Sequence, residues 1–238
     1  MSASTPASAS LTLLPHPVNS TVHTVGQLLA SKEHIDTNSL ADRHFDDTFF
    51  VPFYRDILTL KPDETLNSSL GGIRLLSARE ASGSLVQLNA EKMEVRGLKD
   101  PQGALDLVAK SPSAQSWLKL RLAEGKEVVF VTKVQSVRNA NWRRCSVVDV
   151  GNGMVRVREE RRASRADEEA VDLGEGGLLK KVDSETGEEL AVASPTGSKN
   201  DVLALEVRKV VLEEGDGGDV QCELGEALGQ EEAAAFLK

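Results

Sequence analysis

The stretch EVVFVTKVQSVRNANWRRCSVVDVGNGMVRVREERR, residues Glu127 to Arg162, joins the most strand-like part of the chain to a cluster of arginines. Its first third is rich in Val and Phe, and β-branched and aromatic residues favour strands. Further on, Val155 and Val157 alternate with Arg156 and Arg158, so the valines should face one side of a strand and the arginines the other. A half-exposed strand of a soluble protein and a membrane-crossing β-strand share this alternation, and periodicity alone leaves both open.

The flanking segments predict further elements. DVLALEVRKVVLEE, which begins at Asp201, is the second strand-like segment, and about sixty residues rich in Gly, Arg and Glu precede it. A connection of that length is expected to be functional or disordered. Two Pro-initiated helices are predicted, one after Asp100 and one from Ser111 to Gly125. IRLLSARE and LVQLNAEKMEVRG predict a hairpin within residues 73–97.

Near the N-terminus, one face of a short helix is predicted from the spacing of Val22, Val25, Leu28 and Leu29. The segment FDDTFFVPFYRDILTL holds five of the nine aromatic residues, and this density favours core packing over a ligand site. Residues 1–20 are rich in Ser, Thr, Ala and Pro and are expected to form a disordered tail. We therefore expect a domain over residues 21–214, followed by an acidic tail at 215–238.

Charge is unevenly distributed along the 238 residues. The whole chain has a net charge of -9, which argues against bulk nucleic-acid binding. Residues 121–165 carry 11 Lys and Arg against 5 Asp and Glu, whereas residues 166–238 carry 6 against 19. Solvated faces with an acidic tail are one interpretation of this split, and a basic surface for an anionic partner is another.

Motifs for chemistry are missing from the sequence. The four histidines lie near the N-terminus without metal-ligand spacing, and the two cysteines are read as reduced structural thiols. There is no dinucleotide-binding glycine motif, phosphate-binding loop or nucleophile elbow. We expect no enzymatic activity, no metal and no cofactor. The sequence also has no apolar run of about 20 residues that could form a transmembrane helix.

Three segments in order resemble the pore-forming N-terminal domain of gasdermins. They are FYRDILTL, SWLKLRLAEGKEVVFVTKV and DVLALEVRKVVLEE, and the resemblance covers roughly residues 22–214. It implies an α+β fold with a twisted, mostly antiparallel sheet, flanking helices and two extensible hairpins. The first hairpin would match residues 73–97, and the second would lie within residues 139–200. Only about two dozen residues follow Glu214, which most resembles the short fungal gasdermins that lack a repressor domain.

The resemblance also implies a function. The chain would be cytoplasmic when inactive. At the plasma membrane it would bind acidic phospholipid, oligomerise into a ring and insert its hairpins, causing a pyroptosis-like programmed cell death. Its trigger would be an incompatible variant of the same protein, as in the non-self recognition that underlies heterokaryon incompatibility. The chain alone is expected to be soluble and not spontaneously lytic.

These expectations assign roles to individual residues. The gasdermin first helix is usually basic, but Val22–Lys32 has few basic residues, so the arginine cluster is assigned to anionic lipid. The lipid-binding residues would be Arg143, Arg144, Arg156, Arg158, Arg161, Arg162 and Arg165. The membrane-inserting residues would be Ile73, Leu75, Val86, Leu88, Val155 and Val157. Two other classes of function stay open: a soluble α/β module that binds an acidic partner through its basic strand region, and an enzyme without a linear motif.

Overall fold

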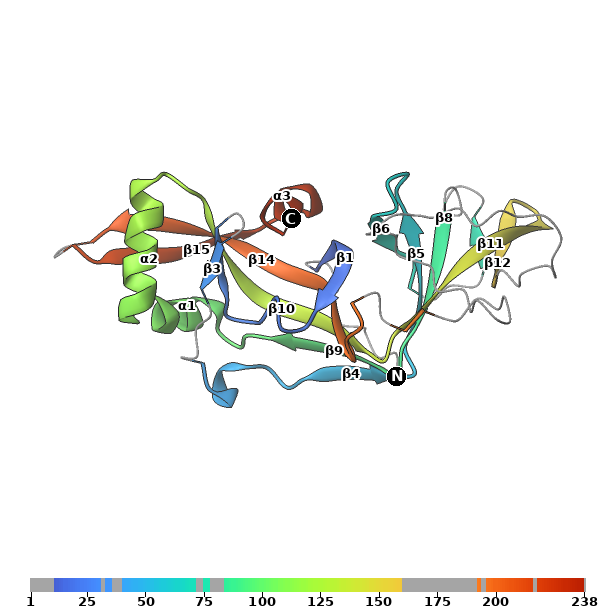
Figure 1. The fold of residues 1–238 in the computed structure, drawn as a ribbon, viewed down its shortest axis with the longest axis horizontal. Helices are drawn as coiled ribbons and strands as arrows, with labels where there is room; N and C mark the ends of the chain where they lie inside the picture. Colours follow the sequence, from blue (N-terminus) through green and yellow to red (C-terminus); the bar gives the residue numbers. More distant parts are fainter. Residues whose placement is uncertain are drawn as a thin grey trace.

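The computed structural model describes residues 11–30, 33–35, 40–71, 75–77, 84–159, 192–193, 196–215 and 218–237. Within them the chain forms two antiparallel sheets and three α-helices, which lie along an elongated molecule (Figure 1). The sheet that we call sheet I carries α1 and α2 at one end of the molecule, and the second, sheet II, forms the other end. The α+β, mostly antiparallel architecture expected from the sequence is confirmed.

Sheet I has eight described strands in the order β1-β14-β10-β2-β3, with β15 paired to β14, and with β9 paired to both β10 and β4. The strands are β1 (Thr12–Asn19), β2 (Leu28–Ala30), β3 (Glu33–Ile35), β4 (Phe49–Pro52), β9 (Lys92–Gly97), β10 (Val128–Arg138), β14 (Asn200–Glu214) and β15 (Val220–Ala227). A 3-10 turn, η1 (Asp42–His44), precedes β4. The two segments most strand-like in sequence, β10 and β14, pair with each other along the middle of the sheet.

Sheet II has seven described strands in the order β6-β5-β8-β11-β12-β7, with β13 paired to β11. The strands are β5 (Arg55–Leu60), β6 (Leu66–Ser69), β7 (Leu75–Ser77), β8 (Ser84–Asn89), β11 (Asn141–Gly151), β12 (Met154–Glu159) and β13 (Val192–Ala193). Trp142, Leu58 and Leu88 of this sheet share a core with Met93, Val137 and Leu203 of sheet I. This shared core joins the two sheets.

The helices begin where their caps predict. The Asp100 side chain accepts a hydrogen bond from the Gly103 amide (3.0 Å) at the start of α1 (Pro101–Ala109). Ser111 does the same for the Ala114 amide (3.2 Å) at the start of α2 (Pro112–Ala123). Apolar residues of both helices, among them Leu105 and Leu118, pack on sheet I against Phe130. The two predicted helices are therefore confirmed.

Both predicted tails contribute to the fold instead. Thr12–Asn19 forms β1, an edge strand that pairs with β14. Its two prolines, Pro15 and Pro17, lie between the paired residues Leu13 and Val18. The C-terminal segment forms β15 and α3 (Gln230–Phe236), and Ala233 of α3 is fully buried against Leu14 and Val129. The expected boundaries at 20 and 215 therefore do not separate folded from tail residues.

The predicted helix near Val22 is wrong. Gly26 adopts a φ of +89°, and the chain then enters β2. Leu28 packs in the core beneath the helices, whereas Leu29 packs in a separate core with Leu14 and Val129. Neighbouring residues that face opposite sides of a sheet mimic part of a helical spacing, which explains the error.

The first predicted hairpin is also wrong, because its two strand segments do not pair with each other. The segment beginning at Leu75 forms β7, which pairs with β12, whereas β8 pairs with β5 and β11. Two strands, β11 and β12, separate β7 from β8 in the sheet order. The segment LVQLNAEKMEVRG contains two strands, β8 and β9, which lie in different sheets.

Candidate functional site

Strands β11 and β12 form a hairpin in sheet II, and both lie within the stretch from Glu127 to Arg162 in which valines and arginines alternate. Cys145 pairs with Glu159 and Val147 with Val157, and the chain reverses at residues 151–153. Gly151, Asn152 and Gly153 all have positive φ there, which glycine and asparagine tolerate best. The sequence therefore produces a tight reversal between two paired strands.

The two faces of this hairpin differ in chemistry. Val155 is 8% exposed and packs with Ile57, Leu85 and Cys145, and Val157 packs against the same cluster. Arg156 is exposed on the opposite face, where it pairs with Val148. The predicted alternation of valines and arginines along β12 is confirmed, although Val155 is already buried in this state.

The outer half of β11 is exposed on both faces. Its last five residues, 147–151, are all exposed, and Met154 follows across the turn. Val147 and Val148 point to opposite faces and are 38% and 37% exposed, and Val150 is 46% exposed. This part of the hairpin presents apolar side chains that the rest of the described molecule does not cover.

The predicted lipid-binding arginines do not form one described surface. Arg143 and Arg144 are neighbours on β11 and so face opposite sides, and Arg144 forms an ion pair with Glu64. Arg156 is exposed, and Arg158 is placed only by its backbone in β12. Arg161, Arg162 and Arg165 lie outside the described residues.

The residues predicted for the first inserting hairpin occupy different environments. Val86 and Leu88 are fully buried in the core shared by the sheets. Leu75 lies in β7, where its backbone pairs with Arg156, and Ile73 lies outside the described residues. In this state Val86 and Leu88 are core residues of sheet II.

An exposed aromatic strip on β4 was missed by the sequence reasoning, which assigned it to the core. Phe49, Phe50 and Phe53 are 47%, 56% and 80% exposed. The Lys92 ammonium lies 5.0 Å from the centre of the Phe50 ring and also forms an ion pair with Glu94. Two adjacent phenylalanines in a strand point to opposite faces. This spacing indicates that at least one of the two rings is exposed when the strand has a single buried face.

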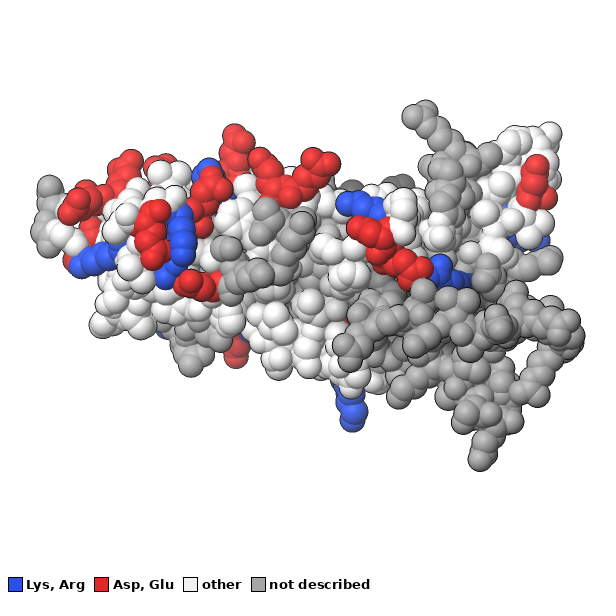
Figure 2. Space-filling view, turned by 45° about the horizontal axis from the view of Figure 1, so that its top comes forward, with Lys and Arg blue, Asp and Glu red and all other residues white. Residues whose placement is uncertain are grey.

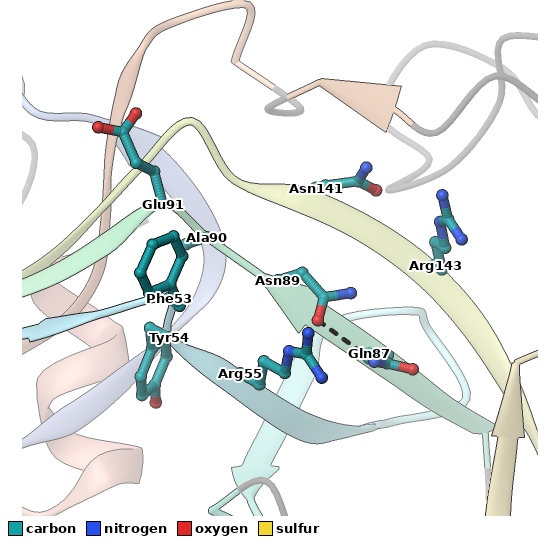
Figure 3. A pocket seen from close by; sticks show the side chains of 9 residues that line it. All are labelled: Phe53, Tyr54, Arg55, Gln87, Asn89, Ala90, Glu91, Asn141 and Arg143. Atoms are coloured by element: carbon teal, nitrogen blue, oxygen red, sulfur yellow. Dashed lines mark hydrogen bonds between the residues drawn. The ribbon is translucent and has the colours of Figure 1, made fainter.

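A polar hollow of about 450 Å³ lies at the junction of the two sheets (Figure 3). Its wall comes from β5, β8 and β11 and from the turns beside them. The lining residues are Phe53, Tyr54, Arg55, Gln87, Asn89, Ala90, Glu91, Asn141 and Arg143. The hydroxyl of Tyr54 turns away to donate to Asp56 (2.8 Å), and burial together with that carboxylate raises the Tyr54 pKa. The hollow is therefore lined by amides, two guanidinium groups and one carboxylate.

Acidic side chains gather over the opposite end of the molecule, which carries α2, β14 and β15 (Figure 2). The described acidic residues of the C-terminal segment are Glu213, Glu214, Asp219, Glu223, Glu226, Glu231 and Glu232. Some of this charge is neutralised: Lys119, for example, approaches Asp219 at 3.5 Å. The acidic part of the charge asymmetry seen in the sequence therefore gathers at one end of the described molecule.

Other chemical features are sparse. In the parts of the chain that are described, no group of His, Cys, Asp and Glu is arranged to hold a metal ion. Cys145 and Cys222 are free thiols, and burial raises the pKa of Cys222 to about 11. None of the described helices is long and apolar enough to span a bilayer.

Comparisons with known proteins give little sequence support. No family model matches the chain, and no curated protein matches it. Among solved structures, one match is a bacterial gasdermin from Bradyrhizobium tropiciagri, with 14% identity over 90% of this chain and 86% of that one, at a TM-score of 0.33. That protein belongs to the family that the sequence motifs resemble. Because a TM-score this low carries no inference about function, function is inferred below from the residues of this chain.

Proposed function

We propose that this chain is a gasdermin-like pore-forming protein whose β11–β12 hairpin crosses a membrane. The observation that supports this most is the hairpin itself, which has an apolar face and a basic face and leaves its outer half uncovered. Val147, Val155 and Val157 share one face of the outer hairpin, while Arg144 and Arg156 share the other; Arg143 lies on the valine face at the base of β11. Lipid outside and water inside a pore require such a division.

The length of β11 fits a bilayer. It has 11 residues, and about 9–11 residues of a tilted strand are enough to cross the hydrocarbon core, while β12 is described over six residues. Asp149 falls on the apolar face, but it lies next to the turn, where its carboxylate accepts a hydrogen bond from the Gly151 amide (2.7 Å). In a crossing hairpin this position would emerge in water on the far side.

A single hairpin leaves unpaired backbone groups at its two edges, and these are costly in lipid. Crossing therefore requires several copies whose hairpins close into a continuous barrel, which is why we propose self-assembly into a ring. The chain would rest in the cytoplasm and act at the plasma membrane. From the sequence resemblance, we propose that an incompatible variant of the same protein triggers the change.

Two surfaces would make the first contact with an anionic bilayer. The phenylalanine strip on β4 combines aromatic rings with Lys92, and aromatic and basic residues are both favoured at the membrane interface. The seven arginines proposed from the sequence would add roughly 1 kcal/mol of attraction for each one that reaches the surface. The acidic end around β15 would face away from the same membrane because of charge repulsion.

The test uses two neighbouring valines that differ only in the face they occupy. Val147 and Val148 are equally exposed, so Val147→Lys and Val148→Lys should affect the resting fold equally. A lysine facing lipid costs about 2–4 kcal/mol at the bilayer midplane and less toward the interface, whereas one facing the lumen is tolerated. Val147 would lie between the midplane and the interface. Because the cost recurs in each subunit, we expect Val147→Lys to reduce dye release from anionic vesicles strongly and Val148→Lys to retain most of it.

The assay is run with the chain alone and mixed with a divergent variant, on vesicles with and without anionic lipid. Circular dichroism and vesicle co-sedimentation show whether each variant folds and binds. Equal loss of release by both lysine variants would contradict a crossing hairpin. Absence of release by the unmodified chain under every condition would contradict pore formation.

A further inference from the structure

The polar hollow at the junction of the sheets lies at the base of the proposed crossing hairpin, with which it shares Asn141 and Arg143 of β11. Strand register places its residues in two rows on one face of sheet II. Arg55, Asn89 and Asn141 pair across three strands in one row, and Gln87 pairs with Arg143 in the next. Because directly paired residues point to the same face, the two arginines approach the hollow from either side of β8.

The arginine side of the hollow is rich in donors. Arg55 is exposed and forms no ion pair with any residue that the structure describes. The Gln87 side-chain amide donates to the Asn89 side-chain oxygen (3.3 Å), and this leaves the NH₂ group of Asn89 available as a donor (Figure 3). Guanidinium groups bind phosphate with paired, charge-assisted hydrogen bonds, so this side suits a phosphate ester.

The opposite end carries a carboxylate. Glu91 lies there and accepts a hydrogen bond from the Asn139 side-chain amide (2.5 Å), and the Phe53 ring stands beside it, 80% exposed. Asn141 lies nearer Arg143, and its enclosed side-chain oxygen has no hydrogen-bond partner among the described residues. Figure 3 shows Glu91 and Phe53 at one end of the hollow and Arg143 at the other. A carboxylate next to an aromatic face favours an ammonium group.

We propose that this hollow binds a small zwitterion that carries a phosphate ester at one end and an amine at the other, such as a phosphoethanolamine group. Arg55 and Arg143 hold the phosphate, with the Asn89 amide beneath it. The ammonium group points toward Glu91 and lies against the Phe53 ring. A volume of about 450 Å³ accommodates such a group, since small-molecule sites typically begin near 300 Å³.

This site does not depend on pore formation, because its residues lie at the base of sheet II and not in the outer hairpin. The same group occurs free in solution and as the headgroup of a phospholipid. Both sources present the same phosphate and amine to the hollow, and experiments can separate them.

Isothermal titration calorimetry on the full chain compares three soluble probes: phosphoethanolamine, glycerol 3-phosphate and inorganic phosphate. Phosphoethanolamine should bind most tightly. The double variant Arg55→Gln/Arg143→Gln should weaken it by about tenfold or more, as expected for lost hydrogen bonds to a charged group. Glu91→Gln should reduce the preference for phosphoethanolamine over glycerol phosphate severalfold while keeping phosphate binding.

The matched control is Lys61→Gln, which removes one exposed positive charge just beyond the far end of β5 and should leave binding unchanged. Urea denaturation confirms that each variant folds. Phosphatidylglycerol vesicles with and without phosphatidylethanolamine distinguish a lipid source from a free one, since only a lipid source makes binding depend on both that lipid and the arginines. Equal affinity for inorganic phosphate and phosphoethanolamine would overturn the zwitterion assignment. Failure of all soluble and vesicle probes to bind would overturn the site.

Discussion

Strands β10 and β11 follow one another in the chain, have 11 residues each and are separated by two residues, yet their surroundings differ sharply. Seven residues of β10 are buried, and the strand has α1 and α2 on one face and α3 on the other. Only two residues of β11 are buried, both in its first half. The first half of β11 contributes Trp142 to the core shared by the two sheets, whereas residues 147–151 extend beyond that core and are exposed.

This difference indicates how stability is distributed. Burial of apolar side chains supplies most of the free energy of folding, and regions with few buried contacts open first. Sheet I should therefore stay folded while the outer hairpin of sheet II rearranges. A hairpin that can leave its neighbours without unfolding the rest of the molecule is what the proposed membrane insertion requires.

The largest effect is expected in β10. Phe130 is fully buried beneath the helices, and Phe130→Ala should lower the free energy of unfolding by about 3–5 kcal/mol. Urea denaturation followed by circular dichroism measures it. A loss below about 1 kcal/mol would show that sheet I does not dominate stability.

A smaller effect is expected at the base of sheet II. Asp56 is 1% exposed and accepts hydrogen bonds from Tyr54 (2.8 Å) and Ser69 (2.6 Å). Asp56→Ala leaves both hydroxyl groups without this partner and should cost about 1–3 kcal/mol. In a hydrogen-exchange experiment the loss of protection should be greater in β5 and β8 than in β10. Equal loss in both sheets would mean that they open as one unit.

Little effect is expected in the outer hairpin. Val150 is 46% exposed, and Val150→Ala should change the free energy of unfolding by less than about 0.5 kcal/mol. Urea denaturation under the conditions used for Phe130→Ala makes the comparison direct. A cost near that of the β10 substitution would contradict the division between core and hairpin.

At neutral pH the smallest effect is expected at Cys222 of β15, whose contribution to stability changes only at alkaline pH. Burial raises the folded-state pKa of Cys222 to about 11 from a usual value near 9, so the unfolded chain loses this proton first. The contribution of the protonated thiol is complete below about pH 9 and declines as the pH rises toward about 11. Cys222→Ala should remove this part of the pH dependence, as urea midpoints between pH 8 and pH 11 would show. An unchanged pH profile would mean that β15 does not shield the thiol.

Local signals predicted the features that depend on local physics. The caps at Asp100 and Ser111 gave the two helices, and the valine-rich segments gave β10 and β14. The alternation at Val155 also held, because a strand with one covered face imposes a period of two.

Features that depend on distant pairing were missed. The prolines of β1 and the acidic residues of β15 suggested tails, but an edge strand tolerates both. The polar hollow forms because Arg55, Asn89 and Asn141 fall in one row, and their sequence positions carry no sign of that register. The phenylalanines of β4 were assigned to the core because composition does not show which strand faces remain uncovered.

The central claim is that the valine face of the β11–β12 hairpin contacts lipid, and site-specific fluorescence tests it most directly. In a Cys145→Ala/Cys222→Ala background that still releases dye, Val147→Cys and Val148→Cys are each labelled with a polarity-sensitive probe. On anionic vesicles under permeabilising conditions, the probe at 147 should shift to the blue and be quenched by a quencher on the lipid chains. The probe at 148 should remain in a watery environment. Equal responses at the two positions, whether both lipid-like or both aqueous, would contradict a membrane-crossing hairpin with one lipid face.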